Sequence, residues 1–377
     1  MYKLAAIGLG QRMTSIINLL ERTGKCVLAY VADPRIDGVK EEQAAAGRDI
    51  SKIKFYTSAE ELFENEKPDG VCVGTRCSLH AKYADMALRK GYPLFLEKPV
   101  CTTRDDLAML ERLLVEFPEE CKKVTVSFPL RFTEQVLKVK QMVAEGKIGE
   151  IAHIQAWCNV SYALGYYHKW YRDDKETGGL FLQKATHDVD YITDILGAKP
   201  TLICGMTSKQ VFKGDKPAGT LCRNCPDKDT CIDFTSDQGT DYRPNDGCVF
   251  AKDTGNEDSG SGIIMYDNGV HLAYSQDFIS RRSAGKRGAR FIGHLGTIEF
   301  DWEENYMIYH DHYGERHDIQ ISSKSGGHFG GDDMLAEDFL KALSGKETRC
   351  TLADGVRSAK LCLCLKESSI EKRFIEY

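Results

Sequence analysis

Hydrophobic and polar positions follow two different patterns along the chain. In the first third, short apolar runs alternate with stretches in which apolar residues recur at helical spacing. The apolar runs predict strands at 3–7, 26–32, 70–74, 93–97 and 124–128. Helical patterns follow Gly10, Ser58, Ser78 and Thr103. Strands and helices that alternate at this spacing indicate a parallel sheet with helices on both faces.

The rest of the chain carries runs of strands without helices between them. Helical patterns are expected at 134–145, 184–196, 332–343 and 353–369. Strands are expected at 151–160, 262–266, 270–278, 289–292, 297–301 and 307–310. This order indicates a mainly antiparallel open sheet with one face packed on helices. The fold class is therefore α/β, with a doubly wound parallel sheet in 1–123 and an α+β domain in 124–377. The polar stretch at about 207–260 is interpreted as an insertion.

The composition is that of an ordinary globular protein. Of the 377 residues, 42% are hydrophobic and 28% are charged, which excludes a disordered, fibrous or coiled-coil chain. The net charge of −6 disfavours broad binding to nucleic acids or anionic membranes. No apolar run reaches the roughly eighteen residues that span a bilayer, and the first ten residues are interpreted as a strand rather than a signal peptide. We expect a cytoplasmic protein with no nucleic-acid and no membrane partner.

A glycine turn follows the first strand and opens the first helix. Gly8 and Gly10 allow the backbone to approach a pyrophosphate, and the helix N-terminus offers N–H donors to it. The turn is completed by Gln11, Arg12 and Met13. Met13 stands where a third glycine is usual. The pattern predicts an NAD(P)-binding Rossmann domain in 1–123.

An acid at the end of the second strand bears on the choice of nucleotide. Asp33 stands 23 residues after Gly10, where a carboxylate can accept hydrogen bonds from the hydroxyls of the adenosine ribose. A 2′-phosphate would lie against this carboxylate, so NAD(H) is expected. Arg35 is close enough to soften that preference, and NADP(H) stays open.

Four stretches carry a resemblance to a known family. They are GLGQRM with Asp33, the segment from PDGVCVG to LFLEKP, GGLFLQKATHDVD, and GGHFGGDD around His328 to Asp333. They resemble the Gfo/Idh/MocA oxidoreductases, the family of glucose–fructose oxidoreductase and inositol dehydrogenases. The resemblance covers most of the chain apart from the insertion. Within the family the chain is most similar to unassigned members with a cysteine-bearing insertion.

The resemblance implies a nicotinamide cofactor and a sugar, polyol or related small-molecule carbohydrate substrate. It also implies an open C-terminal sheet that often forms the oligomer interface, so a homo-dimer or homo-tetramer is expected. The cofactor-binding residues implied by the matched motifs, beyond the glycine turn with Asp33 and Arg35, are Thr75, His80, Glu97 and Lys98.

Two residues are candidates for proton transfer and polarisation. His187 is the better base, because the pKa of histidine lies near neutrality. Lys98, at the carboxyl end of a strand, can donate a hydrogen bond and positive charge to a substrate oxygen. The family assigns catalytic roles to both positions. Gln183 stands four residues before His187, where family dehydrogenases often carry Asp, and a neutral amide can orient a group but cannot stabilise an imidazolium by charge.

Further candidates surround this helix. Gln183, His187 and Asp190 fall on one face if the helix starts this early, and Lys184 and Asp188 form an adjacent i, i+4 pair. The aromatic residues before the helix suit sugar rings or form a lid or interface. The candidate substrate residues are Lys98, Arg131, Tyr167, Trp170, Gln183, Lys184 and His187. Near Arg131, Pro129 stands where many family members carry Asn.

Four of the fourteen cysteines gather in the insertion. They are Cys222, Cys225, Cys231 and Cys248. A long polar loop needs a staple, and four thiolates around a structural zinc ion would provide one. The first pair has good ligand spacing, whereas the wider gaps of the second pair match no common zinc motif. Free thiols and a redox function are the alternatives.

These observations lead to one main hypothesis and two alternatives. The main hypothesis is an NAD(H)-dependent oxidoreductase that moves a hydride to or from a secondary hydroxyl or ketone of a carbohydrate. The first alternative is a glycosidase or lyase type of enzyme that retains NAD and uses transient oxidation. The second is a non-catalytic nucleotide- or sugar-sensing regulator on the same fold.

Overall fold

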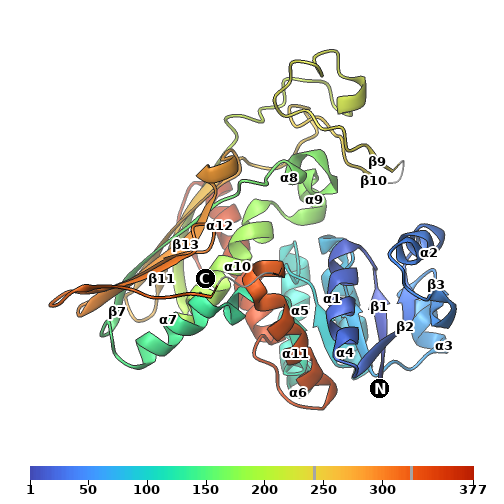
Figure 1. Cartoon of the computed structure of the whole chain (residues 1–377), viewed down its shortest axis with the longest axis horizontal. Helices are drawn as coiled ribbons and strands as arrows, with labels where there is room; N and C mark the ends of the chain where they lie inside the picture. Colours follow the sequence, from blue (N-terminus) through green and yellow to red (C-terminus); the bar gives the residue numbers. More distant parts are fainter. Residues whose placement is uncertain (241–242, 323–325) are drawn as a thin grey trace. The chain divides into compact units, whose positions relative to one another are not determined.

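A computed structural model describes residues 1–240, 243–322 and 326–377. The chain divides into two compact units (Figure 1). The first consists of residues 1–133 and 324–359, and the second of residues 134–323 and 360–377. The first unit therefore takes in a segment that follows the long 134–323 stretch of the second unit in the sequence.

The first unit is built on a six-stranded parallel sheet with the order β3-β2-β1-β4-β5-β6. The strands are β1 (Tyr2–Ile7), β2 (Cys26–Ala32), β3 (Lys54–Tyr56), β4 (Gly70–Val73), β5 (Leu94–Leu96) and β6 (Val124–Val126). The order reverses between β1 and β4, and ligands of doubly wound sheets bind at the carboxyl ends of the strands beside such a switch point. The predicted doubly wound parallel sheet is confirmed.

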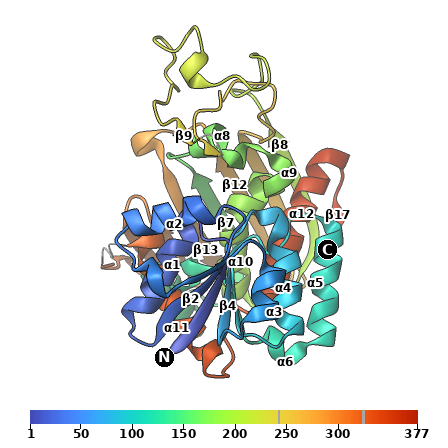
Figure 2. The same cartoon turned by 90° about the vertical axis from the view of Figure 1, so that its right-hand side faces the viewer.

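Helices cover both faces of this sheet, as Figure 2 shows. The helices of the first unit are α1 (Gln11–Arg22), α2 (Ile36–Ala45), α3 (Ala59–Asn65), α4 (His80–Arg89), α5 (Arg104–Glu116), α6 (Pro118–Cys121) and α11 (Gly331–Leu343). Helix α11 packs beside α1, and α5 packs beside α4. Their buried stripes, such as Leu107, Leu110 and Leu113 of α5, meet the apolar strands and form the core.

Two helices of this unit begin at the caps that the sequence predicts. The Ser58 hydroxyl accepts a hydrogen bond of 3.1 Å from the Glu61 N–H, and the Glu61 carboxylate accepts one from the Thr57 N–H. The Thr103 hydroxyl accepts from the Asp106 N–H at 3.1 Å. Each cap satisfies a backbone donor that the first turn of a helix leaves unpaired.

The second unit is built on a nine-stranded sheet with the order β16-β15-β14-β13-β7-β12-β11-β8-β17. The strands are β7 (Ile151–Asn159), β8 (Pro200–Ser208), β11 (Ser259–Tyr266), β12 (His271–Asp277), β13 (Lys286–Gly293), β14 (Gly296–Asp301), β15 (Tyr306–Asp311), β16 (Arg316–Asp318) and β17 (Ile375–Glu376). Only the pair of β7 and β12 is parallel among these neighbours. The predicted, mainly antiparallel sheet is confirmed.

Helices cover one face of this sheet (Figure 1). The helices are α7 (Glu134–Ala144), α8 (Gly165–His168), α9 (Asp174–Thr177), α10 (Thr186–Leu196) and the part of α12 (Leu352–Glu371) that follows residue 359. Gly205 and Gly262 lie opposite each other on β8 and β11, and a Cβ on either would collide with Leu365 of α12. The absence of side chains at these two positions thus lets α12 lie close to the sheet.

The long insertion leaves β8 and returns at β11. It contains the short strands β9 (Gly239–Thr240) and β10 (Arg243–Pro244), and residues 241–242 lie outside the described part of the chain. The buried Asp258 carboxylate accepts hydrogen bonds from the backbone N–H groups of Gln210, Val211 and Phe212. The buried Phe212 ring packs 4.2 Å from that of Tyr167. A carboxylate and an aromatic pair therefore hold the base of the insertion.

Candidate functional site

The glycine turn after β1 is shaped by close backbone contacts. Gly8 has a φ of +76°, and a Cβ there would lie 2.9 Å from Thr75 after β4. A side chain at Gly8 is therefore excluded by both backbone conformation and space. A Cβ at Gly10 would meet nothing within 4 Å, so the space before α1 is open.

The start of α1 has the properties of an anion site. Its first turn contains no acidic residue, and its N-cap is Gly10. The N–H groups of a 12-residue helix and its dipole point into the open space at this end. The pyrophosphate of a dinucleotide fits this arrangement in charge and in hydrogen-bonding capacity.

Asp33 lies beside the glycine turn, where the sequence places a ribose acceptor. Its carboxylate is buried and accepts hydrogen bonds from the N–H groups of Leu9 and Arg35, at 3.3 and 2.9 Å. The Arg35 guanidinium lies 3.6 Å from the same carboxylate. The structure therefore brings together the turn, Asp33 and Arg35, and Arg35 partly offsets the negative charge that would repel a 2′-phosphate.

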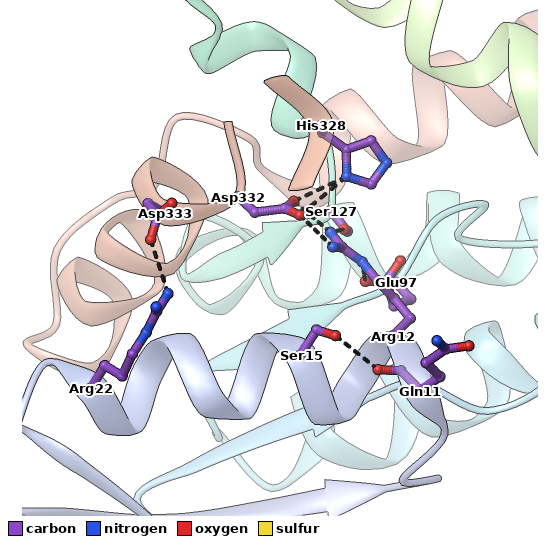
Figure 3. Close-up of polar contacts among 9 residues, drawn as sticks. All are labelled: Gln11, Arg12, Ser15, Arg22, Glu97, Ser127, His328, Asp332 and Asp333. Atoms are coloured by element: carbon purple, nitrogen blue, oxygen red, sulfur yellow. Dashed lines mark hydrogen bonds and ion pairs between the residues drawn. The ribbon is translucent and has the colours of Figure 1, made fainter. Parts of the chain in front are cut away.

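Arg12 of the turn is the centre of a charged cluster (Figure 3). Its guanidinium donates to both carboxylate oxygens of Asp332 at 2.7 and 2.8 Å, and to Glu97 at 3.0 Å. A fourth contact reaches the Ser127 hydroxyl at 3.2 Å. Arg12 thus joins α1 to the ends of β5 and β6 and to α11, and its positive charge is neutralised by protein carboxylates.

Asp332 also holds the unusual turn that precedes α11. His328 Nδ1 lies 3.2 Å from both Asp332 oxygens, and His328 and Phe329 adopt left-handed φ values of 49° and 56°. A Cβ on Gly327 would collide with the Asp332 carboxylate. Burial alone would raise the pKa of Asp332, but His328 and Arg12 hold it well below its usual range. The carboxylate is therefore ionised and fixes a turn that is otherwise strained.

The Glu97-Lys98-Pro99 segment leaves the carboxyl end of β5. Glu97 is buried against Arg12, Lys98 is half-buried, and the peptide bond between Lys98 and Pro99 is cis. The buried His80 ring lies 2.7 Å from the Pro99 carbonyl and 3.3 Å from the Thr75 carbonyl. Burial lowers the pKa of His80. His80 thus ties two loops of the strand edge together.

In the second unit, the predicted catalytic residues lie on a helix with an irregular start. Residues Phe181–Ala185 form a π-helical turn that continues directly into α10. Gln183 is buried and donates from Nε2 to the Thr177 carbonyl at 3.1 Å. His187 is buried in the first turn of α10. Such π-turns are frequent at functional sites, and this one brings Gln183, Lys184 and His187 into one short stretch.

The buried charged side chains around this stretch do not form the i, i+4 pair of Lys184 and Asp188 that the sequence spacing predicts. Asp188 accepts two hydrogen bonds from Arg287 of β13, at 2.9 and 3.1 Å, and one from the Tyr274 hydroxyl. Lys184, four residues before Asp188, instead donates to the Tyr162 hydroxyl. Burial works to lower the pKa of Lys184, but the hydroxyls of Tyr166 and Tyr162 hold it above its usual value.

The remaining predicted residues have diverse environments. Tyr167 is fully buried, and its hydroxyl donates to the Glu257 carbonyl at 2.7 Å. Trp170 is half-buried and stacks on Tyr171 at 3.9 Å. Arg131 is buried in the first unit and pairs with Asp354 at 3.1 Å.

The structural zinc ion predicted from the cysteine spacing is not supported by the structure. Across the described ranges, no three His, Cys, Asp or Glu side chains come together in a way that could hold a metal ion. Cys222, Cys225 and Cys248 are buried and Cys231 is half-buried, all as free thiols. Burial raises the pKa of Cys222 and Cys248, which disfavours the thiolate that zinc requires. The insertion is held instead by carboxylates, as at Asp258.

Several residues of the cluster around Arg12 and of the buried cluster around Asp188 and Lys184 were not predicted from the sequence. Asp332, Arg287 and Tyr162 lie far along the chain from the residues they contact. The GGHFGGDD motif is the one signal that pointed toward Asp332, since its glycines allow the close turn. Nothing in the sequence signals that Arg287 or Tyr162 reaches the helix of His187.

Comparison with known proteins agrees with the geometry. Residues 2–128 match the oxidoreductase family with an NAD-binding Rossmann fold, and residues 136–299 match the GFO/IDH/MocA C-terminal domain. Together the two stretches make up most of the chain. No helix in the described segments has the length and apolar character needed to cross a membrane.

Two curated relatives illustrate the similarity. The putative oxidoreductase YteT of Bacillus subtilis is 28% identical over 324 residues, which are 74% of each chain. The myo-inositol 2-dehydrogenase of Thermotoga maritima is 27% identical over 201 residues, 52% of this chain and 55% of that protein.

Solved structures share the fold over nearly the whole length. The oxidoreductase domain protein of Kribbella flavida has a TM-score of 0.77 at 17% identity, covering 100% of this chain and 99% of that one. The aldose-aldose oxidoreductase of Caulobacter crescentus has a TM-score of 0.73 at 15% identity, with the same coverage.

Proposed function

The chain belongs to the Gfo/Idh/MocA family of NAD-binding oxidoreductases, and we propose that it moves a hydride to or from a secondary hydroxyl or ketone of a sugar or polyol. The observation that supports this most directly is that the chain retains the lysine and the histidine to which the family motifs assign catalytic roles. Lys98 stands at the carboxyl end of β5, and His187 stands in the first turn of α10. Relatives named as inositol dehydrogenases act on polyols, which is consistent with this substrate class.

In the proposed reaction each side chain has a distinct task. When bound, the nicotinamide cofactor accepts or supplies the hydride. His187 takes the proton of the substrate hydroxyl during oxidation and returns it during reduction. The Lys98 ammonium stabilises negative charge that develops on a substrate oxygen. Gln183, held by the Thr177 carbonyl, orients the neighbouring groups without adding charge.

The proposed cofactor is NAD(H), held by the open N-terminus of α1 and by Asp33. The buried Asp33 carboxylate lies where ribose hydroxyls would donate to it, which favours NAD(H) over NADP(H). Arg35 beside it leaves room for weaker binding of NADP(H).

The experiment compares wild type with Lys98→Ala and His187→Ala. Both variants should still be stabilised against heat by NAD+, because a saturating ligand raises the free energy of unfolding by about 2.7 kcal/mol at a hundredfold excess over Kd. Turnover measured as NADH formation on a panel of sugars and polyols should fall at least about a hundredfold. Turnover at the wild-type rate in either variant would defeat the proposal. Product without NADH would favour the alternative in which the cofactor is retained.

We also propose that the open face of the second sheet joins two copies of the chain. Leu202, Met206, Ile263 and Met265 lie on the face turned away from α12, and Met206 is 71% exposed. Exposed apolar side chains on adjacent strands are typical of an interface. Light scattering should give at least twice the mass of one chain, and Ile263→Asp should lower it. A wild-type protein of single-chain mass would contradict this.

A further inference from the structure

The second unit contains a buried ammonium with an unusual partner. Lys184 is 4% exposed, and its ammonium donates to the hydroxyl of Tyr162. The same ammonium lies 4.8 Å from the centre of the Tyr162 ring. Tyr162 itself is 59% exposed and follows β7. The buried Lys184 ammonium therefore donates a hydrogen bond to a phenol that is itself exposed to solvent.

The partners of the Lys184 ammonium are phenols rather than a carboxylate. Asp188, one turn along the helix, is engaged by Arg287 and by the Tyr274 hydroxyl. No carboxylate in the described ranges lies within ion-pair distance of the Lys184 ammonium. Arg287 thus takes the Asp188 carboxylate, and the Lys184 ammonium contacts a phenol instead. The Tyr166 and Tyr162 phenols, rather than a carboxylate, hold the pKa of Lys184 above its usual value, and an anionic ligand bound at Tyr162 would stabilise the same positive charge further.

The direction of the hydrogen bond fixes what Tyr162 can offer. An ammonium can only donate, so the phenol oxygen of Tyr162 is the acceptor. The single phenol hydrogen is then left to be donated to another group. Positive charge behind a hydroxyl strengthens that donation, most of all toward an anionic acceptor. Arg287 also lies close enough to Tyr162 to act on it electrostatically.

The position of the pair relates it to the proposed chemistry. Lys184 follows Gln183 in the π-turn and precedes His187 by three residues. Residues three apart on a helix are neighbours on its surface. A group bound at Tyr162 would therefore be held by the same turn that carries the proposed base.

We propose that Tyr162, supported by Lys184, binds a carboxylate of the substrate, so that the substrate is an acidic sugar or polyol such as an aldonate or a uronate. This inference rests on the proposed dehydrogenase function and narrows its substrate class. Tyr162 touches the carboxylate, and Lys184 is a positioning residue that holds the hydroxyl and supplies the charge.

The test uses pairs of compounds that differ in the carboxylate. NADH formation by the full chain is measured on D-gluconate against D-glucitol and on D-galacturonate against D-galactose. The acid should be preferred at least tenfold in kcat/KM in one of the pairs. Tyr162→Phe and Lys184→Met should bring that ratio close to one, chiefly through a higher KM for the acid, and Lys184→Arg should restore part of it.

A matched control is Tyr313→Phe, because Tyr313 is another exposed tyrosine of the same unit and should leave the ratio unchanged. If Lys184→Met fails to fold, Tyr162→Phe alone decides. NADH formation with equal preference for acid and neutral partner would overturn the inference and leave the proposed function intact.

A second readout covers the case in which no compound is turned over, which would count against the proposed function. Thermal unfolding of the NAD+-loaded protein is then measured with gluconate and with glucitol. A shift with the acid that Tyr162→Phe abolishes would support the carboxylate site. Equal shifts, or none with any acid, would overturn it.

Discussion

The Arg12 cluster of the first unit and the Arg287 cluster of the second unit each place an arginine on a carboxylate in a two-pronged contact, and they differ in how their charges balance. In the first unit Arg12 meets Asp332 at 2.7 and 2.8 Å and has Glu97 as a second carboxylate partner. In the second unit Arg287 meets Asp188 at 2.9 and 3.1 Å, and the nearby Lys184 ammonium donates to the Tyr162 phenol rather than to any carboxylate of the described residues.

The difference indicates two distinct uses of the same contact. Arg12 contacts acids from distant positions in the sequence, so its cluster connects α1, the end of β5 and α11. The side chain of Arg12 is 29% exposed, whereas Arg287 and Asp188 are almost completely enclosed. The second cluster therefore depends on one carboxylate, and it leaves positive charge for another group to balance.

The largest expected effect comes from removing that single carboxylate. Asp188→Asn leaves two buried cations without an anion and should lower the free energy of unfolding by about 3–5 kcal/mol. Urea unfolding of the full chain measures this. The matched control is Asp194→Asn on the same helix, whose partner Lys140 has a side chain that is 44% exposed, and it should cost no more than about 1 kcal/mol. Similar losses in the two variants would remove the contrast between buried and exposed pairs.

A smaller effect, with a characteristic pH dependence, is expected in the first unit. Asp332→Asn should cost about 1–3 kcal/mol at pH 7, because charge-assisted hydrogen bonds from Arg12 and His328 are weakened. The pKa of Asp332 is lower in the folded than in the unfolded protein, so its contribution is complete above about pH 4 and declines as the pH falls further. Unfolding at pH 7 and pH 3 should show the gap between wild type and variant narrowing in acid. A gap that widens in acid would contradict this sign.

The smallest effect belongs to a local contact and serves as a baseline for both clusters. Thr103→Ala removes the N-cap of α5 and should cost about 1 kcal/mol. Because this hydrogen bond joins an uncharged hydroxyl and an uncharged backbone N–H, the loss should be nearly the same in high salt, and NAD+ should stabilise the variant as it does wild type. A loss as large as that of Asp188→Asn would mean that local capping rivals the buried ion pair.

Local features account for what the sequence predicted well. Most strands of both sheets, the caps at Ser58 and Thr103 and the turn at Gly8 depend on residues within a few positions of one another. The strands β3, β8, β16 and β17 were not predicted. The open side of the second sheet also follows from alternating patterns such as that of β11. These signals depend on backbone geometry and burial, which a short window of sequence carries.

Long-range choices account for what the sequence did not reveal. Asp188 binds Arg287, 99 residues away, in preference to Lys184 four residues away, because the sheet brings a guanidinium to the helix face. Asp332 reaches Arg12 across 320 positions. The cysteine spacing suggested zinc, yet the described side chains of the insertion converge on no metal site. The roles assigned to Lys98, Gln183 and His187 stay predictions until the variants are measured.

The discontinuous first unit has a consequence for biogenesis. Helix α11 packs on α1 and on the strand β6, yet it is synthesised about two hundred residues after β6. During translation the nucleotide-binding sheet therefore emerges with one flank bare, and it stays so until nearly the whole polypeptide has left the ribosome. The Arg12–Asp332 contact is among the last to close. Nascent chains stalled before residue 331 should consequently depend on chaperones more than the finished protein does.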